Sequence, residues 1–284
     1  MEQFILHFFK KKTREVDVQL LTAHFESVVG FEVVEEAKSI QYIYTHPRLG
    51  YKAAFILSKS SMVPDLVRLD PSYLDVNFRL ELPLLTPTYV VKEIFQITQN
   101  LVEKFHLYIY TSLLEDVMEF KIETLTVLFN QSKNYYKERN PLILSSYQVV
   151  SENKATAILR YIDEAPHLQK YYEDYNIFVP KYHILKDGDD NLVLAMEWRE
   201  GQAIVFPPYL DFVFYRTASE VKVIPIDDIV EVIYEFLENV PGFIKETKVI
   251  NHNNMKKGMK LMKKTRFEKF THNFSKEELT SIVD

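Results

Sequence analysis

The fold is decided by residues 71–101, which read PSYLDVNFRLELPLLTPTYVVKEIFQITQNL. Toward Leu82, apolar and charged residues alternate, which is the period of a strand with one buried face. Thr86 and Pro87 then mark a helix start, because threonine caps helix N-termini and proline fits the first helical position. The helix carries an apolar stripe of Val90, Val91, Ile94, Phe95, Thr98 and Leu101. A strand followed by an amphipathic helix predicts a sheet covered by helices.

Similar elements extend on both sides of this segment. The first half has further strand-like stretches at 4–9, 31–34, 40–45, 52–57 and 107–110, and helical ones after Thr13 and at 113–129. The second half has helical stretches at 155–162 and 166–174, a hairpin of 177–185 with 192–199, strands at 203–206, 211–216 and 221–224, and a helix of 227–240. We therefore expect an α+β protein made of two sheet-and-helix units, mainly antiparallel.

The boundaries of these units follow from composition. We expect an N-terminal α+β unit at residues 1–135, a C-terminal α+β unit at 150–244, and a basic tail with a short terminal helix at 245–284. The linker is placed within 130–152, where the chain turns polar and contains Asn140-Pro141. Ser275 and Glu278 have the spacing of a capping box, which predicts a final helix up to Val283.

Two octapeptides raise the possibility of an internal duplication. Pro71–Phe78 and Pro207–Phe214 share five identities in eight positions. A chain of this length produces on the order of one such pair by chance, so the match alone proves nothing. Each copy lies on a predicted strand that leads into an aliphatic helix, which favours a repeat. The alternative is two unrelated α+β segments.

Composition removes several kinds of reactive site. The chain has no cysteine, which excludes disulfides, thiolate nucleophiles and cysteine metal sites. Its six glycines are isolated, so neither the dinucleotide-binding nor the Walker phosphate loop is present. The eight histidines include no pair three or four residues apart, so no helix turn presents two metal ligands. We therefore expect neither a cofactor nor a metal, and the pattern assigns no catalytic residue.

A candidate groove between the halves comes from the octapeptides. Its residues are Tyr73, Asp75, Tyr209 and Asp211. An aspartate within a strand is disfavoured, so the two carboxyl groups could face a shared binding site. The structural interpretation, that each aspartate caps a turn beside a proline, is favoured over the functional one. For an enzyme, His46 and His183 near predicted strand ends are the histidines of interest.

The basic segment is the least ordinary feature of the chain. Residues 245–270 contain nine Lys or Arg and two acids, although the whole chain has a net charge of −6. As a helix, this segment places Met255, Met259 and Met262 on one side. Candidate partner-binding residues are Lys256, Lys257, Lys260, Lys263, Lys264 and Arg266. The segment either docks on the acidic body or stays solvated, which is favoured, or it engages an acidic surface, RNA or anionic lipid.

Three classes of function remain open. The first is a non-catalytic binding protein with a protein or small-ligand partner. The second is a hydrolase or transferase with a carboxylate and histidine site, and the third is a nucleic-acid-associated protein acting only through residues 252–270. We expect no signal peptide, since the cations at 10–12 follow the short apolar start, and no transmembrane segment, so a cytoplasmic location is favoured. Oligomeric state is not indicated.

Overall fold

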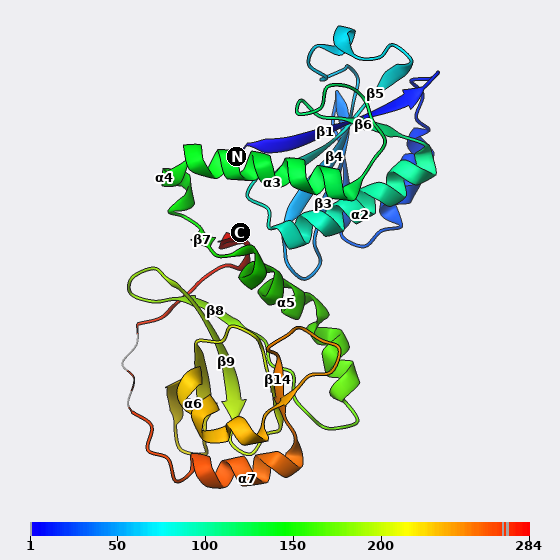
Figure 1. Cartoon of the computed structure of the whole chain (residues 1–284). Coiled ribbons are helices and arrows are strands. Elements are labelled where there is room, and N and C mark those ends of the chain that lie inside the picture. The colour runs from blue at the N-terminus through cyan, green and yellow to red at the C-terminus, as the bar shows by residue number, and fades with distance from the viewer. Residues whose placement is uncertain (1, 269, 271–272) are drawn as a thin grey trace. The chain divides into compact units, whose positions relative to one another are not determined.

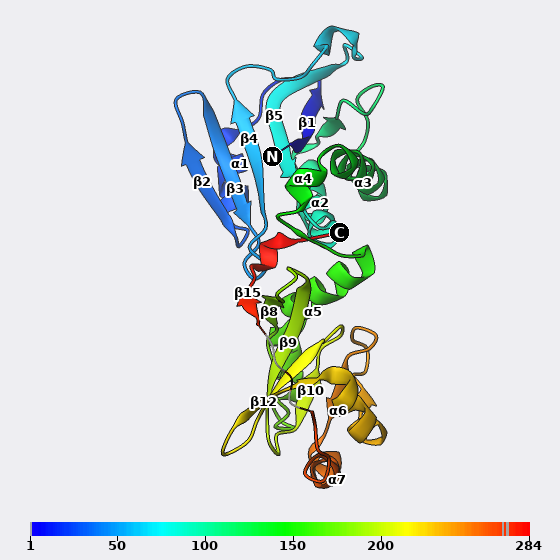
Figure 2. The same cartoon turned by 90° about the vertical axis from the view of Figure 1, so that its left-hand side faces the viewer.

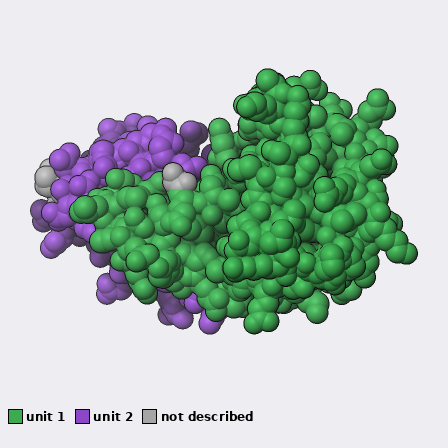
Figure 3. All heavy atoms as spheres, turned by 90° about the horizontal axis from the view of Figure 1, so that it is seen from above, with its two compact units in different colours: residues 1–147, 283–284 green, residues 148–282 purple. Residues whose placement is uncertain are grey.

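The computed structural model describes residues 2–268, 270 and 273–284. It confirms an α+β protein whose sheets are mainly antiparallel (Figure 1). The chain forms two compact units (Figure 3). Unit 1 comprises residues 1–147 with 283–284, and unit 2 comprises residues 148–282.

Unit 1 is built on a six-stranded sheet. Its strands are β1 (Gln3–Lys11), β2 (Phe31–Glu35), β3 (Ser39–Thr45), β4 (Lys52–Ser58), β5 (Tyr73–Pro83) and β6 (Tyr108–Tyr110). Its helices are α1 (Val18–Glu26), α2 (Thr88–Phe105), α3 (Ile122–Arg139) and the short α4 (Pro141–Leu144), with a 3-10 turn at Leu66–Arg68. The strand order is β2-β3-β4-β5-β1-β6, and the neighbouring strands pair antiparallel.

Helices cover one face of this sheet, as Figure 2 shows. Aromatic rings from alternate strand positions project toward them, because side chains of a strand alternate between faces. Phe25 of α1 packs on Tyr42 of β3 and Phe55 of β4. On β1, Phe4 packs against Phe95 of α2 and Phe129 of α3. These helices therefore bury a common aromatic core.

The opposite face of the sheet is partly covered by loops. A bulge interrupts the pairing of β1 with β5, since Phe8 pairs with Phe78 but Phe9 pairs with Asp75. Asn77 within the bulge has φ of 58°, a left-handed conformation that asparagine tolerates better than most residues. Phe9 joins a second apolar cluster with Leu69, Tyr110 and Val117.

Unit 2 contains two main sheets. Its strands are β7 (Gln148–Val149), β8 (His183–Lys186), β9 (Leu192–Arg199), β10 (Ile204–Phe206), β11 (Phe212–Arg216), β12 (Val221–Pro225), β13 (Glu238–Asn239), β14 (Lys248–Ile250) and β15 (Ser275–Lys276). Its helices are α5 (Glu152–Tyr172), α6 (Ile226–Ile233) and α7 (His252–Met262), with 3-10 turns at Tyr234–Phe236 and Leu279–Ser281. The short β16 (Ile282–Val283) lies where the chain returns to unit 1. The sheet orders are β12-β11-β9-β8-β15 and β10-β14-β13.

The structure does not confirm an internal duplication. β5 is a long strand that pairs antiparallel with β1 and β4, its neighbours in the sheet. β11 instead pairs parallel with β9 and antiparallel with β12. The two octapeptides therefore enter different strand arrangements.

Several local expectations differ from the structure. The helix expected at 113–129 begins at Ile122, and the helix expected at 227–240 ends at Ile233 and is followed by a 3-10 turn. α3 continues to Arg139 through the start of the expected linker, because Lys133 and Tyr136 lie on its buried side. α5 is a single helix that contains Pro166, where two helices were expected. In place of a final helix up to Val283, the chain forms a short strand, a 3-10 turn and another short strand.

Candidate functional sites

Tyr73 and Asp75 both lie on β5 of unit 1, in different surroundings. The Tyr73 ring packs edge-on against Tyr108, and the Lys11 ammonium lies 5.2 Å from the Tyr73 ring centre. Asp75 is 4% exposed, and its Oδ1 accepts a hydrogen bond of 2.9 Å from the Asn77 amide within the bulge. Its buried Oδ2 has no hydrogen-bond partner among the described residues.

Tyr209 and Asp211 lie before β11 in unit 2. The Oδ2 of Asp211 accepts a hydrogen bond of 2.8 Å from the Leu194 amide of β9. Burial raises the pKa of the Asp211 carboxyl, and the Leu194 hydrogen bond opposes that rise. The Tyr209 ring is 38% exposed and lies 6.0 Å from the Lys154 ammonium. The Asp211 carboxyl therefore links the start of β11 to β9 by a hydrogen bond, whereas one buried oxygen of Asp75 has no hydrogen-bond partner among the described residues.

The four groove residues thus occupy two places, two in each unit. A groove shared by both pairs stays a prediction. Within unit 1, the register of the sheet adds other polar neighbours to Asp75, which the sequence analysis did not connect with it.

A polar cluster surrounds Asp75 on the sheet face opposite the helices. His7 pairs directly with Arg79, and Phe9, two residues after His7, pairs with Asp75. Arg79 donates hydrogen bonds to Glu81 Oε1 at 2.6 Å and to Ser58 Oγ at 2.7 Å. Burial lowers the pKa of the His7 imidazole, while the nearby Asp75 carboxylate acts in the opposite direction. The cluster gathers an acid and a base but is covered, with His7 only 6% exposed.

The histidines expected near strand ends also differ from each other. His46 is buried, and its Nε2 lies 2.9 Å from Glu93 Oε2. Its Nδ1 accepts hydrogen bonds from the amides of Arg48 and Leu49, so Nε2 carries the proton and donates it to Glu93. Both ring nitrogens are used, which suits a positioning role better than proton transfer to a substrate. His183 is exposed on β8.

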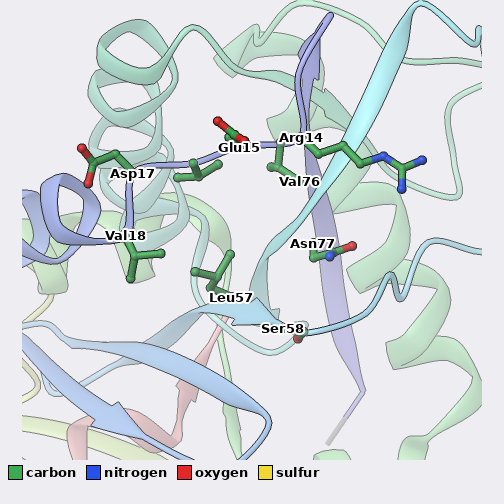
Figure 4. Close-up of a pocket in the computed structure, with 9 residues that line it drawn as sticks. Arg14, Glu15, Asp17, Val18, Leu57, Ser58, Val76 and Asn77 are labelled. Atoms are coloured by element: carbon green, nitrogen blue, oxygen red, sulfur yellow. The ribbon is translucent and has the colours of Figure 1, made fainter.

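Unit 1 has an open depression of about 480 Å³ on its surface. It is lined by Arg14, Glu15, Val16, Asp17, Val18, Leu57, Ser58, Val76 and Asn77. The Arg14 and Asp17 side chains point in opposite directions (Figure 4). Asp17 also caps α1 by accepting a hydrogen bond from the Leu20 amide. The depression therefore gathers no converging set of charged groups.

The basic segment of unit 2 contains α7, whose apolar side packs on the unit. Met255 and Met262 are buried in a cluster with Ile233 and Ile250. Gly258 allows this close approach, because a Cβ at that position would lie 3.3 Å from the Cδ1 of Ile250. Asn251 caps the helix by accepting hydrogen bonds from the amides at 253 and 254. α7 is therefore held in a fixed orientation.

The other side of α7 and the residues after it form what we term the basic face. Its members are Lys256, Lys257, Lys260, Lys263, Lys264 and Arg266, and all six side chains are exposed. Lys263 pairs with Glu200 at 3.1 Å. For the other five, the described part of the chain supplies no ion-pair partner within 4.0 Å. α7 thus packs on unit 2 through its methionines and leaves the cations of the basic face exposed.

Comparisons with protein-family models, with curated proteins and with solved structures find no match to this chain. Within the described residues, every helix is too short or too polar to cross a membrane.

Proposed function

We propose that the protein is a non-catalytic interaction protein whose unit 2 binds an acidic segment of another protein through the basic face of α7. One observation carries the proposal. Five cations of the basic face have no ion-pair partner within 4.0 Å among the described residues, although the chain as a whole is acidic. A cytoplasmic location belongs to the same proposal.

The spacing of the cations suits an extended acidic partner. Lys256 and Lys260 are four residues apart on a helix, so their Cβ atoms are neighbours about 6 Å apart. The apolar side of α7 is anchored by Met255 and Met262, so the backbone under these cations is already ordered. A partner pays little additional entropy for ordering the backbone here, although the lysine side chains still lose freedom.

Charge favours a protein segment over a nucleic acid. The net charge of −6 repels a long polyanion wherever it extends beyond residues 245–270. A short acidic segment can contact the basic face alone. Nucleic-acid binding through residues 252–270 is the second candidate, and the same cations support it.

Binding is tested with two fluorescent probes on the full chain, a decaglutamate peptide and a ten-nucleotide oligouridine. We expect the peptide to bind more tightly, because ten nucleotides extend further than ten amino-acid residues and so meet repulsion from the acidic remainder of the chain. The charge reversal K256E/K260E should weaken peptide binding about tenfold, since each exposed ion pair contributes modestly. The matched control K170E/K181E changes two exposed lysines of unit 2 outside the basic face and should leave binding unchanged.

Three outcomes contradict this proposal. Absence of peptide binding at low salt removes it. An equal loss in both double variants shows general charge attraction and not a site. Tighter binding of the oligouridine, with a steep loss between 50 and 200 mM salt, supports the nucleic-acid alternative.

A further inference from the structure

A buried carboxylate lies at the N-terminus of α2 in unit 1. The Thr88 amide donates to both oxygens of the Asp284 side chain, at 3.2 and 3.1 Å. The Lys133 ammonium of α3 donates to Asp284 Oδ1 at 2.5 Å. The side chains of Lys133 and Asp284 are only 3% and 1% exposed.

The two groups that donate to Asp284, Thr88 and Lys133, also form hydrogen bonds with neighbouring residues. The Lys133 ammonium also donates to Thr88 Oγ1 at 3.0 Å and to the Thr86 carbonyl at 3.5 Å. The Thr88 hydroxyl donates to Asn130 Oδ1 at 3.2 Å. A lysine ammonium has three protons, and these three acceptors account for them.

This set of donors has the chemistry of an oxyanion site. The first amides of an α-helix lack intrahelical acceptors and carry partial positive charge, so they favour an anion. α2 has 18 residues, and Lys133 adds a buried positive charge beside its first turn. The carboxylate that binds these donors belongs to Asp284, 196 positions after Thr88 in the chain.

Contacts other than those to Asp284 also position the two donors. Lys133 lies on the buried side of α3 together with Leu125, Phe129 and Tyr136. Thr88 is the first residue of α2, whose apolar side is buried against the sheet. The site is therefore a fixed part of unit 1.

We infer that Thr88 and Lys133 form a pre-built oxyanion site whose resident ligand is the chain's own Asp284 carboxylate, and that a free small carboxylate binds there once that side chain is removed. Formate is the simplest probe, because it has the planar geometry of the resident group. In the wild-type chain the Asp284 carboxylate occupies this site. This inference does not depend on the basic face.

Rescue of a truncated side chain tests the site in the full chain. D284A leaves Lys133 buried without its carboxylate and should lower the melting temperature. Sodium formate should raise it saturably, by roughly 3–7 °C at 0.2 M over sodium chloride of equal ionic strength. The wild-type chain and the double variant K133M/D284A should show no saturable rise with formate.

Two results would overturn the inference. A formate response that is absent in D284A, or equal in all three proteins, shows that no oxyanion site exists. If D284A does not fold in buffer, it is refolded in formate and in chloride. Recovery of the circular dichroism signal in formate alone supports the site, and failure in both overturns it.

Discussion

Lysine occupies two opposite environments in this protein. In unit 1, Lys133 is 3% exposed and all three of its protons have acceptors. On the basic face of unit 2, five of the six cations are exposed and have no ion-pair partner within 4.0 Å among the described residues. The lysine ammonium group therefore takes part in the internal hydrogen bonding of unit 1, whereas on the basic face of unit 2 it is exposed to solvent.

Desolvation explains the difference. A buried ammonium is costly unless its hydrogen bonds are complete, so any loss of a partner is strongly destabilising. An exposed ammonium keeps its water, so its ion pairs contribute little to folding. Substitution of Lys133 should consequently lower the stability of the fold strongly. Substitution of a cation of the basic face should weaken binding of a partner and leave stability nearly unchanged.

The largest expected effect is at Lys133. The substitution K133M should lower the free energy of unfolding by about 3–5 kcal/mol, because it strands the Asp284 carboxylate in a buried place. Urea unfolding followed by circular dichroism measures this loss. The double variant K133M/D284L should lose less than the sum of the single variants. Additive losses would show that the two side chains are not coupled.

A smaller effect is expected on the apolar side of α7. Met255 is 2% exposed, so M255A should cost about 2–4 kcal/mol through lost burial and the cavity left behind. K256A, one residue later on the basic face, should leave the unfolding midpoint unchanged and weaken binding of the acidic peptide. Equal destabilisation by the two substitutions would remove the distinction between the two sides of this helix.

The smallest effect concerns a buried histidine near another lysine. His24 is 9% exposed, and its Nδ1 lies 3.4 Å from the Lys104 ammonium. Burial, and then the Lys104 charge, lower the pKa of the imidazole below its ordinary value. The unfolded chain therefore binds a proton near pH 6.5 that the folded chain resists, and stability falls as the pH drops below that value.

The pH effect is measured by urea unfolding at pH 7.0 and 5.5. The wild-type midpoint should fall on acidification, and H24Q should show a smaller fall because it removes one group that titrates differently in the two states. Carboxylates titrate in both proteins, so only the difference between them reports on His24. An identical fall would show that His24 is protonated equally in the folded and unfolded chains.

Local patterns were sufficient to predict the fold class. The strand ending at Leu82 and the helix after Thr86 follow from alternation, a helix stripe and helix-start residues. The methionine side of α7 likewise follows from helical spacing, and Met255 and Met262 are buried as a pair. These signals need only neighbouring residues, so they can be read from sequence.

Pairing between distant residues could not be predicted in this way. Residues 130–134 are polar and suggest a linker, yet they lie within α3 because Lys133 meets an acid 151 residues later. The one available signal is its helical spacing from Leu125 and Phe129, which places it on an apolar stripe. No sequence pattern indicates that Glu93 of α2 meets His46.

The two octapeptides show the same limit. Both contain an aspartate. Asp75 accepts a hydrogen bond from the Asn77 amide within a bulge of its own strand, whereas Asp211 accepts one from the Leu194 amide of a neighbouring strand. The difference lies in the strands that pair with each segment, which belong to other parts of the chain. Short identity therefore did not determine local structure.

The position of Asp284 also sets an order of events during synthesis. A ribosome makes unit 1 first, and domains commonly fold as they emerge. Lys133 then lacks the Asp284 carboxylate until the 135 residues of unit 2 have been made, since the chain returns to unit 1 only at Val283. The nascent unit 1 should therefore stay incompletely stabilised, and open to chaperones, until translation has passed residue 284.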